Sequence, residues 1–140
     1  MTAQLDDLIA LCRDEKMPAV AVTDTGNLFG ALEFALAASA AGVQPIIGCQ
    51  VAVARDGERG HTNGHGDAGD SYDTLVLLVQ NEAGYRNLIK LVSKSYLETE
   101  AGETAHLTLD DIEARPDGLI ALTGGGRGAV GRLLAEGQKD

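Results

Sequence analysis

Apolar runs and polar stretches alternate along the chain in a pattern that predicts both strands and helices. Short apolar runs without helical spacing predict strands over Pro18–Thr23, Ile46–Val53, Asp73–Gln80 and Leu119–Thr123. Apolar residues at helical spacing predict helices over Thr2–Lys16, Phe29–Ala41, Asn81–Glu98 and Ala129–Glu136. A shorter helical turn over Thr108–Glu113 begins with a capping box between Thr108 and Asp111. The pattern therefore predicts an α/β fold of about four strands with flanking helices.

The rest of the chain is organised around the first strand, the helix that follows it and the second strand. A unit of this length makes a right-handed crossover and normally joins a parallel pair of strands. α/β proteins place their sites at the carboxyl ends of such strands. The polar residues that follow Pro18–Thr23 there are Asp24, Thr25 and Asn27.

These polar residues have two interpretations. A carboxylate followed by oxygen side chains can ligate a hard cation or position a water molecule, which would make Asp24 a metal ligand and Asn27 part of its site. Alternatively, Asp24 accepts hydrogen bonds from backbone amides in a turn that holds no ligand. Spacing alone leaves both interpretations open.

A long polar segment, Ala54–Ser71, separates the second and third strands. Its glycines, charges and lack of apolar periodicity predict an exposed, flexible loop. Because it contains no helix, the strands that it joins are expected to be antiparallel neighbours. His61 and His65 lie in this loop, and a lone pair of histidines leaves a metal site incomplete, so we interpret the segment as solvated.

A second glycine-rich segment, Gly124–Gly128, follows the last strand. It lacks the spacing and the lysine of a phosphate-binding loop, which favours a simple strand-to-helix turn. Arg127 lies within it and remains a candidate contact for a nearby carboxylate or phosphate group.

Charge and composition restrict the function classes. The formal net charge is -10, which argues against a nucleic-acid footprint on this domain itself, although the domain can belong to a larger, basic protein. Tyr85 and Tyr96 share a helical stripe with Leu88, so we expect them in the core rather than stacked on bases.

No apolar run reaches the roughly 20 residues of a membrane span. Cys12 and Cys49 lie in apolar stretches and are expected to be buried free thiols of a cytoplasmic protein.

Four stretches together carry a family resemblance: MPAVAVTDTGNLFGALEF, QPIIGCQVAV, TLVLLVQNEAGYRNLIKLVSKSYLE and DGLIALTGGGRGAVGRLL. In this order they resemble the polymerase-and-histidinol-phosphatase (PHP) domain that opens the alpha subunit of bacterial DNA polymerase III. The resemblance covers the chain outside Ala54–Ser71. It implies a partial PHP-type barrel, distorted and similar to a TIM barrel, over residues 1–140. The strand with the family's HxH motif would precede Met1 and the remaining strands would follow Asp140, so we expect a piece of a longer protein.

The resemblance also assigns roles at the strand ends. Asp24 matches an aspartate of the family, whereas Thr25 stands where metal-binding members carry histidine, and Gln50 stands where they carry glutamate. Those members hold divalent zinc, manganese or magnesium. Because a hydroxyl and an amide replace neither imidazole nor carboxylate as ligands, we expect no metal in this chain and a degenerate site.

For the longer protein, the resemblance implies DNA-directed DNA polymerase activity, a nucleotidyl transfer. The present piece holds none of the catalytic residues for that reaction and is expected to be inactive alone. Its implied role is structural, or the docking of partners: the rest of the alpha chain, the proofreading exonuclease subunit and the replisome, with DNA bound only through the whole protein. The alternative is a stand-alone, metal-dependent phosphoesterase of the PHP type.

Overall fold

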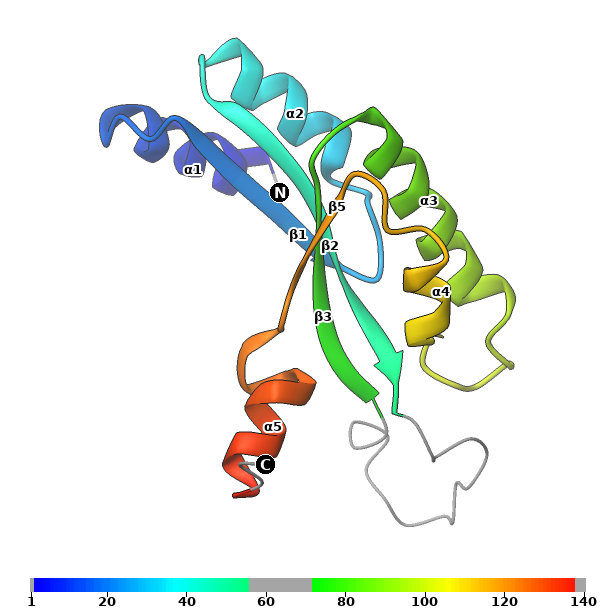
Figure 1. Cartoon of the computed structure of the whole chain (residues 1–140). Helices are drawn as coiled ribbons and strands as arrows, with labels where there is room; N and C mark the ends of the chain where they lie inside the picture. The colour runs from blue at the N-terminus through cyan, green and yellow to red at the C-terminus, as the bar shows by residue number, and fades with distance from the viewer. Residues whose placement is uncertain (1, 56–71, 138–140) are drawn as a thin grey trace.

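The computed structural model describes residues 2–55 and 72–137, so His61, His65 and nearly all of the predicted loop lie outside the described residues. The helices are α1 (Thr2–Asp14), α2 (Ala31–Ala40), α3 (Glu82–Leu97), α4 (Leu109–Glu113) and α5 (Ala129–Ala135), with a 3₁₀ turn, η1, over Gly125–Arg127. The strands are β1 (Ala19–Thr25), β2 (Gln44–Ala54), β3 (Tyr72–Val79), β4 (His106–Leu107) and β5 (Leu119–Leu122) (Figure 1). The predicted α/β class is confirmed.

One mixed sheet contains all the described strands, in the order β1-β2-β3-β5 with β4 beside β2. The predicted pairings are confirmed, because β1 runs parallel to β2 and β3 runs antiparallel to it. The expected four strands become five, because β4 is only two residues long and too short to show a period. Over the described residues the sheet is open and not closed into a barrel (Figure 1).

Two hydrophobic clusters lie on one face of this sheet. The first packs α1 and α2 against β1 and the start of β2, and its buried members are Ile9, Cys12, Phe34, Ala38 and Val43. The second packs α3 against β3 and the end of β2, and its buried members are Cys49, Val51, Val53, Leu77, Leu88, Leu91 and Leu107. Both cysteines are buried and free, as predicted. Strand β2 is therefore common to both clusters.

Helix α3 is fixed at its start by a side-chain cap and a close backbone contact. The Asn81 side chain accepts a hydrogen bond from the Gly84 N–H at 3.0 Å. A Cβ atom on Gly84 would lie 1.8 Å from the carbonyl oxygen of Gly118, so only glycine allows this approach. The predicted burial of Tyr85 and Tyr96 is wrong: they are 38% and 58% exposed. The buried stripe passes through Gly84, Leu88, Leu91 and Ser95, which leaves both tyrosines at its margin.

The predicted capping box at the start of α4 is confirmed. The Thr108 side chain accepts a hydrogen bond from the Asp111 N–H, and the Asp111 side chain accepts one from the Thr108 N–H. Within residues 2–55 and 72–137, no helix has the length and apolar character needed to cross a membrane.

Candidate functional site

Three of the candidate site residues, Asp24, Thr25 and Gln50, lie within β1 and β2, closer to the sheet than the sequence predicted. Asp24 and Thr25 were expected in a turn, but both belong to β1, where they pair with Cys49 and Gln50 of β2. The Gly26 N–H then donates to the Gln50 carbonyl oxygen at 2.8 Å. Strand pairing uses backbone groups, so it continues through polar residues where the neighbouring strand continues.

Because successive strand residues point to opposite faces, the candidate residues divide into two groups. Asp24 shares the face of Val22, which packs against the cluster under α1 and α2. Thr25 and Gln50 are aligned partners on the opposite face, where these helices do not cover the sheet. The structure therefore brings Thr25 and Gln50 together and separates them from Asp24.

Asp24 and Asn27 both stabilise the connection from β1 to α2. Asp24 Oδ2 accepts a hydrogen bond from the Gly30 N–H at 3.3 Å. The Asn27 side chain donates to the Thr25 carbonyl oxygen at 3.0 Å and accepts from the Phe29 N–H at 3.1 Å. These are the contacts of the turn interpretation, and each carboxylate or amide oxygen keeps lone pairs for a further donor.

Cys49 belongs to the second hydrophobic cluster and is the strand partner of Asp24. Burial raises the pKa of this thiol, and the charge of Asp24 adds to the rise, while the Gly26 and Asn27 backbone N–H groups oppose it. The thiol is fully shielded from solvent and stays protonated near neutral pH. A protonated, enclosed thiol is a poor metal ligand and a poor nucleophile.

Arg127, the candidate in the glycine-rich segment, lies in η1. Its side chain is exposed, and in the part of the chain that the structure describes it forms no hydrogen bond or ion pair with the other candidates. Gly124, just before η1, has a φ of 73° and would carry its Cβ 2.1 Å from the Thr74 carbonyl oxygen. The glycines thus serve a tight strand-to-helix turn packed on β3.

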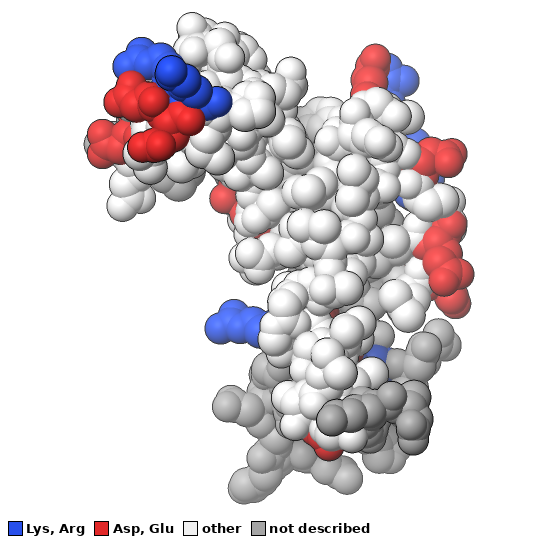
Figure 2. Space-filling view, turned by 60° about the vertical axis from the view of Figure 1, so that its left-hand side comes forward, with Lys and Arg blue, Asp and Glu red and all other residues white. Residues whose placement is uncertain are grey.

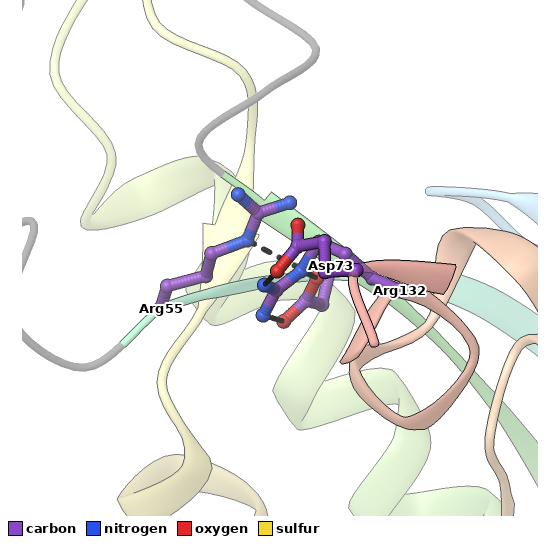
Figure 3. Close-up of polar contacts among 4 residues, drawn as sticks. Arg55, Asp73 and Arg132 are labelled. Carbon is purple, nitrogen blue, oxygen red and sulfur yellow. Dashed lines mark hydrogen bonds and ion pairs between the residues drawn. The ribbon is translucent and has the colours of Figure 1, made fainter. Parts of the chain in front are cut away.

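An ion-pair cluster that the sequence did not reveal joins α5 to the sheet (Figure 3). Asp73 of β3 accepts from Arg132 Nε at 3.0 Å and from Arg132 Nη2 at 3.2 Å, while Arg55 Nε donates to it at 3.1 Å. The Asp73 side chain is only 14% exposed. Hydrogen bonding from Arg132, supported by Arg55, lowers the pKa of the Asp73 carboxyl despite the opposing effect of burial. The one sequence feature that could have indicated this cluster is Asp73 itself, a single charged residue near the start of an otherwise largely apolar strand.

Comparison with known proteins decides the family. The sequence pattern of the PHP domain matches residues 2–140. The chain belongs to the PHP domain family. Its PHP domain is 40% identical over 133 residues to the DNA polymerase III subunit alpha of Caulobacter vibrioides, a match that covers 95% of this chain and 11% of that protein. It is also 40% identical over 124 residues to the DNA polymerase III subunit alpha of Thermus aquaticus, a match that covers 87% of this chain and 10% of that protein. The resemblance stated above is confirmed, and the chain spans about a tenth of the length of these curated relatives.

At the candidate positions that the structure describes, the side chains of this PHP domain do not fit the divalent metal that the family implies. Thr25 and Gln50, the neighbours on the uncovered face, offer a neutral hydroxyl and a neutral amide. The carboxylate of Asp24 lies on the other face, and the thiol beside it is protonated. Among the described residues, no three His, Cys, Asp or Glu side chains form a group that could hold a metal ion.

Proposed function

We propose that this PHP domain is a structural and partner-docking part of a DNA polymerase III alpha chain, and that its metal site is degenerate. The relatives are DNA polymerase III alpha subunits that align along most of this chain. DNA-directed DNA synthesis then belongs to the longer protein. The open sheet corresponds to part of a PHP-type barrel, whose other strands the longer protein supplies.

The observation that carries this proposal is the pairing of Thr25 with Gln50. They are aligned neighbours on β1 and β2, at the positions where the family resemblance places a histidine and a glutamate. Two neutral oxygen donors give a divalent ion neither charge nor nitrogen ligation, so the site lacks what metal-dependent phosphoester hydrolysis requires. The face remains available for packing against other segments.

Figure 2, which brings the side of α1 and α5 forward, is consistent with packing. Charged side chains gather at the margins of this view, and a broad area without them lies between. We propose that the rest of the alpha chain covers part of this area, and that the exonuclease subunit and other replisome proteins are further partners. Contact with DNA would occur only through the complete alpha chain.

Elemental analysis of the purified chain tests the proposal directly. After dialysis against manganese, zinc or magnesium and then against buffer, we expect metal well below stoichiometric amounts, with no hydrolysis of p-nitrophenyl phosphate. The double variant Thr25→His with Gln50→Glu serves as the comparison, because it supplies two of the missing ligand types. Near-stoichiometric metal in the unaltered chain, or metal-dependent turnover, would overturn the degenerate site and restore the phosphoesterase alternative.

A second experiment addresses the structural role in the longer polymerase. Thr25→Ala and Gln50→Ala should leave primer extension within about twofold, because these groups take no part in the chemistry. Phe34→Ala, which opens a cavity in the first cluster, should lower the yield of active enzyme. A large loss of catalytic rate from Thr25→Ala in a well-folded polymerase would contradict the proposal.

A further inference from the structure

The outer side of α2 carries an unusually exposed apolar row. Phe29, Leu32 and Leu36 are 90%, 72% and 65% exposed. Leu32 and Leu36 are four residues apart and therefore lie along one side of α2, and Phe29 lies in the turn just before this helix. Single exposed apolar residues are common, but a contiguous row of large ones marks an interaction site.

A pocket with acidic groups adjoins this row. Glu33 directly follows Leu32 in the first turn of α2, so it borders the row. Together with Asp24 it lines a pocket of about 180 Å³ between α1 and α2, whose apolar walls include Leu5, Leu8, Val22 and Phe34. On the α1 side, Leu8 and Leu11 are 36% and 57% exposed and extend the apolar surface.

The charged residues that line this pocket, Asp24 and Glu33, are both acidic. Helix α2 contains no lysine or arginine. In the described part of the chain Glu33 forms no ion pair, and Asp24 accepts only the hydrogen bond from Gly30. A pocket with apolar walls and two carboxylates suits a cation on an aliphatic stem, which is the chemistry of a lysine or arginine side chain.

We propose that this α1–α2 surface, formed by Leu8, Leu11, Phe29, Leu32, Glu33 and Leu36, docks a basic amphipathic helix of a partner protein. The partner's apolar side chains pack on the exposed row, and one of its lysine or arginine side chains enters the pocket beside Asp24 and Glu33. The inference rests on the docking role proposed above and names the chemistry of the partner.

A second copy of this chain fits the surface less well. A symmetric dimer through α2 would bring the same acidic surface of each copy together, and the chain carries a formal net charge of -10. Like charges at close range oppose such an interface. A basic partner instead gains from the complementary charge.

The test uses a labelled synthetic helical peptide with leucines on one face and lysines on the other, and a twin in which every lysine is glutamate. Fluorescence anisotropy at about 0.15 M salt measures binding to the whole chain. We expect saturable binding of the lysine peptide only. Glu33→Lys and Leu36→Ser should each weaken it about tenfold or more.

Matched controls separate this surface from general attraction to an acidic protein. Glu113→Lys on α4 makes the same charge change, and Leu97→Ser on α3 removes an 83% exposed leucine. Both should bind the lysine peptide within about twofold of the unaltered chain. Equal losses in these controls, or equal binding of the glutamate peptide, would overturn the proposal.

Two further outcomes would assign the surface to another occupant and also overturn it. One is a dimer in light scattering that Leu36→Ser abolishes. The other is protection of α1 and α2 amides from exchange in the complete polymerase without any added partner. Metal analysis is a separate measurement, so a failure of peptide binding leaves the degenerate-site proposal unaffected.

Discussion

Replacing Asp73 with asparagine tests how α5 is held on the sheet. The change removes the charge that accepts two hydrogen bonds from Arg132 and one from Arg55, while it nearly preserves the side-chain volume. Helix α5 has no buried residue of its own, so this ion pair is a large part of its attachment. We therefore expect a local effect on α5 that exceeds the effect on global unfolding.

The magnitude follows from the exposure of the pair. The side chains of Asp73 and Arg132 are 14% and 25% exposed, between a fully buried and a surface ion pair. Breaking a buried pair costs about 3–5 kcal/mol, and a surface pair contributes about 0–1 kcal/mol. We expect about 2 kcal/mol here, which corresponds to roughly a 30-fold increase in the opening of α5.

Hydrogen exchange measured by mass spectrometry provides the assay. Amides of residues 129–135 should exchange about 30-fold faster in Asp73→Asn, while those of residues 31–40 in α2 change little. Glu136→Gln is the control, because its contact with Arg132 is longer, at 3.4 Å, and more exposed. Unchanged exchange in α5, or an equal increase in α2, would refute the reasoning.

The pH dependence adds an independent check. The Arg132 guanidinium holds the pKa of the Asp73 carboxyl below its usual range. A carboxyl whose pKa is lower in the folded state stabilises the protein fully when the pH is above its unfolded-state pKa of about 3.9. This stabilisation disappears as the pH falls through the folded-state pKa. We compare the exchange rates of α5 amides in the wild type and in Asp73→Asn after correction for intrinsic exchange rates. The difference between the two should stay constant from about pH 5 to 7 and become smaller below about pH 4. A difference that widens on acidification would contradict this assignment.

Two other predictions concern packing. Gly84→Ala should destabilise the chain by about 2–3 kcal/mol in urea unfolding, because its Cβ would lie 1.8 Å from the Gly118 carbonyl oxygen; an unchanged midpoint would contradict this. Phe34→Ala, at a side chain only 1% exposed, should cost about 3–5 kcal/mol, whereas Phe29→Ala, at one 90% exposed, should change stability by less than about 0.5 kcal/mol. Similar losses in both phenylalanine variants would show that exposure does not govern their contributions.

The sequence predicted the sheet well, because apolar runs and turn residues are local signals. The parallel pair through α2, the antiparallel pair across the polar segment and the Thr108 capping box are all confirmed. Strand β4 escaped prediction because its backbone partners on β2 lie more than 50 residues away, as the pairing of Ala52 with His106 shows. The exposure of Tyr96 also depends on tertiary packing, since a helical stripe can rotate by one residue without changing its periodicity.

The geometry at the candidate site could be predicted only in part. Ending the first strand before Asp24 hid the alternation that places Asp24 and Thr25 on opposite faces. The contact between Thr25 and Gln50 depends on the register of β1 against β2, which residue spacing does not determine. The pairing of Asp73 with Arg132 joins segments 59 residues apart, and the charge of a residue does not by itself indicate which opposite charge it contacts.

The register of β2 also bears on how this domain can change over evolutionary time. Strand β1 pairs with residues 44–50 of β2, and β3 pairs with residues 48–54, so the two ladders overlap only at Gly48, Cys49 and Gln50. A Cβ atom on Gly48 would lie 2.7 Å from the Leu77 carbonyl oxygen and 2.9 Å from the Thr23 side chain, in contact with both halves. Substitutions outside this overlap can accumulate in one half with little effect on the other. Those within it must satisfy both halves at once, so we expect Gly48, whose added Cβ atom would contact both, to tolerate the fewest substitutions.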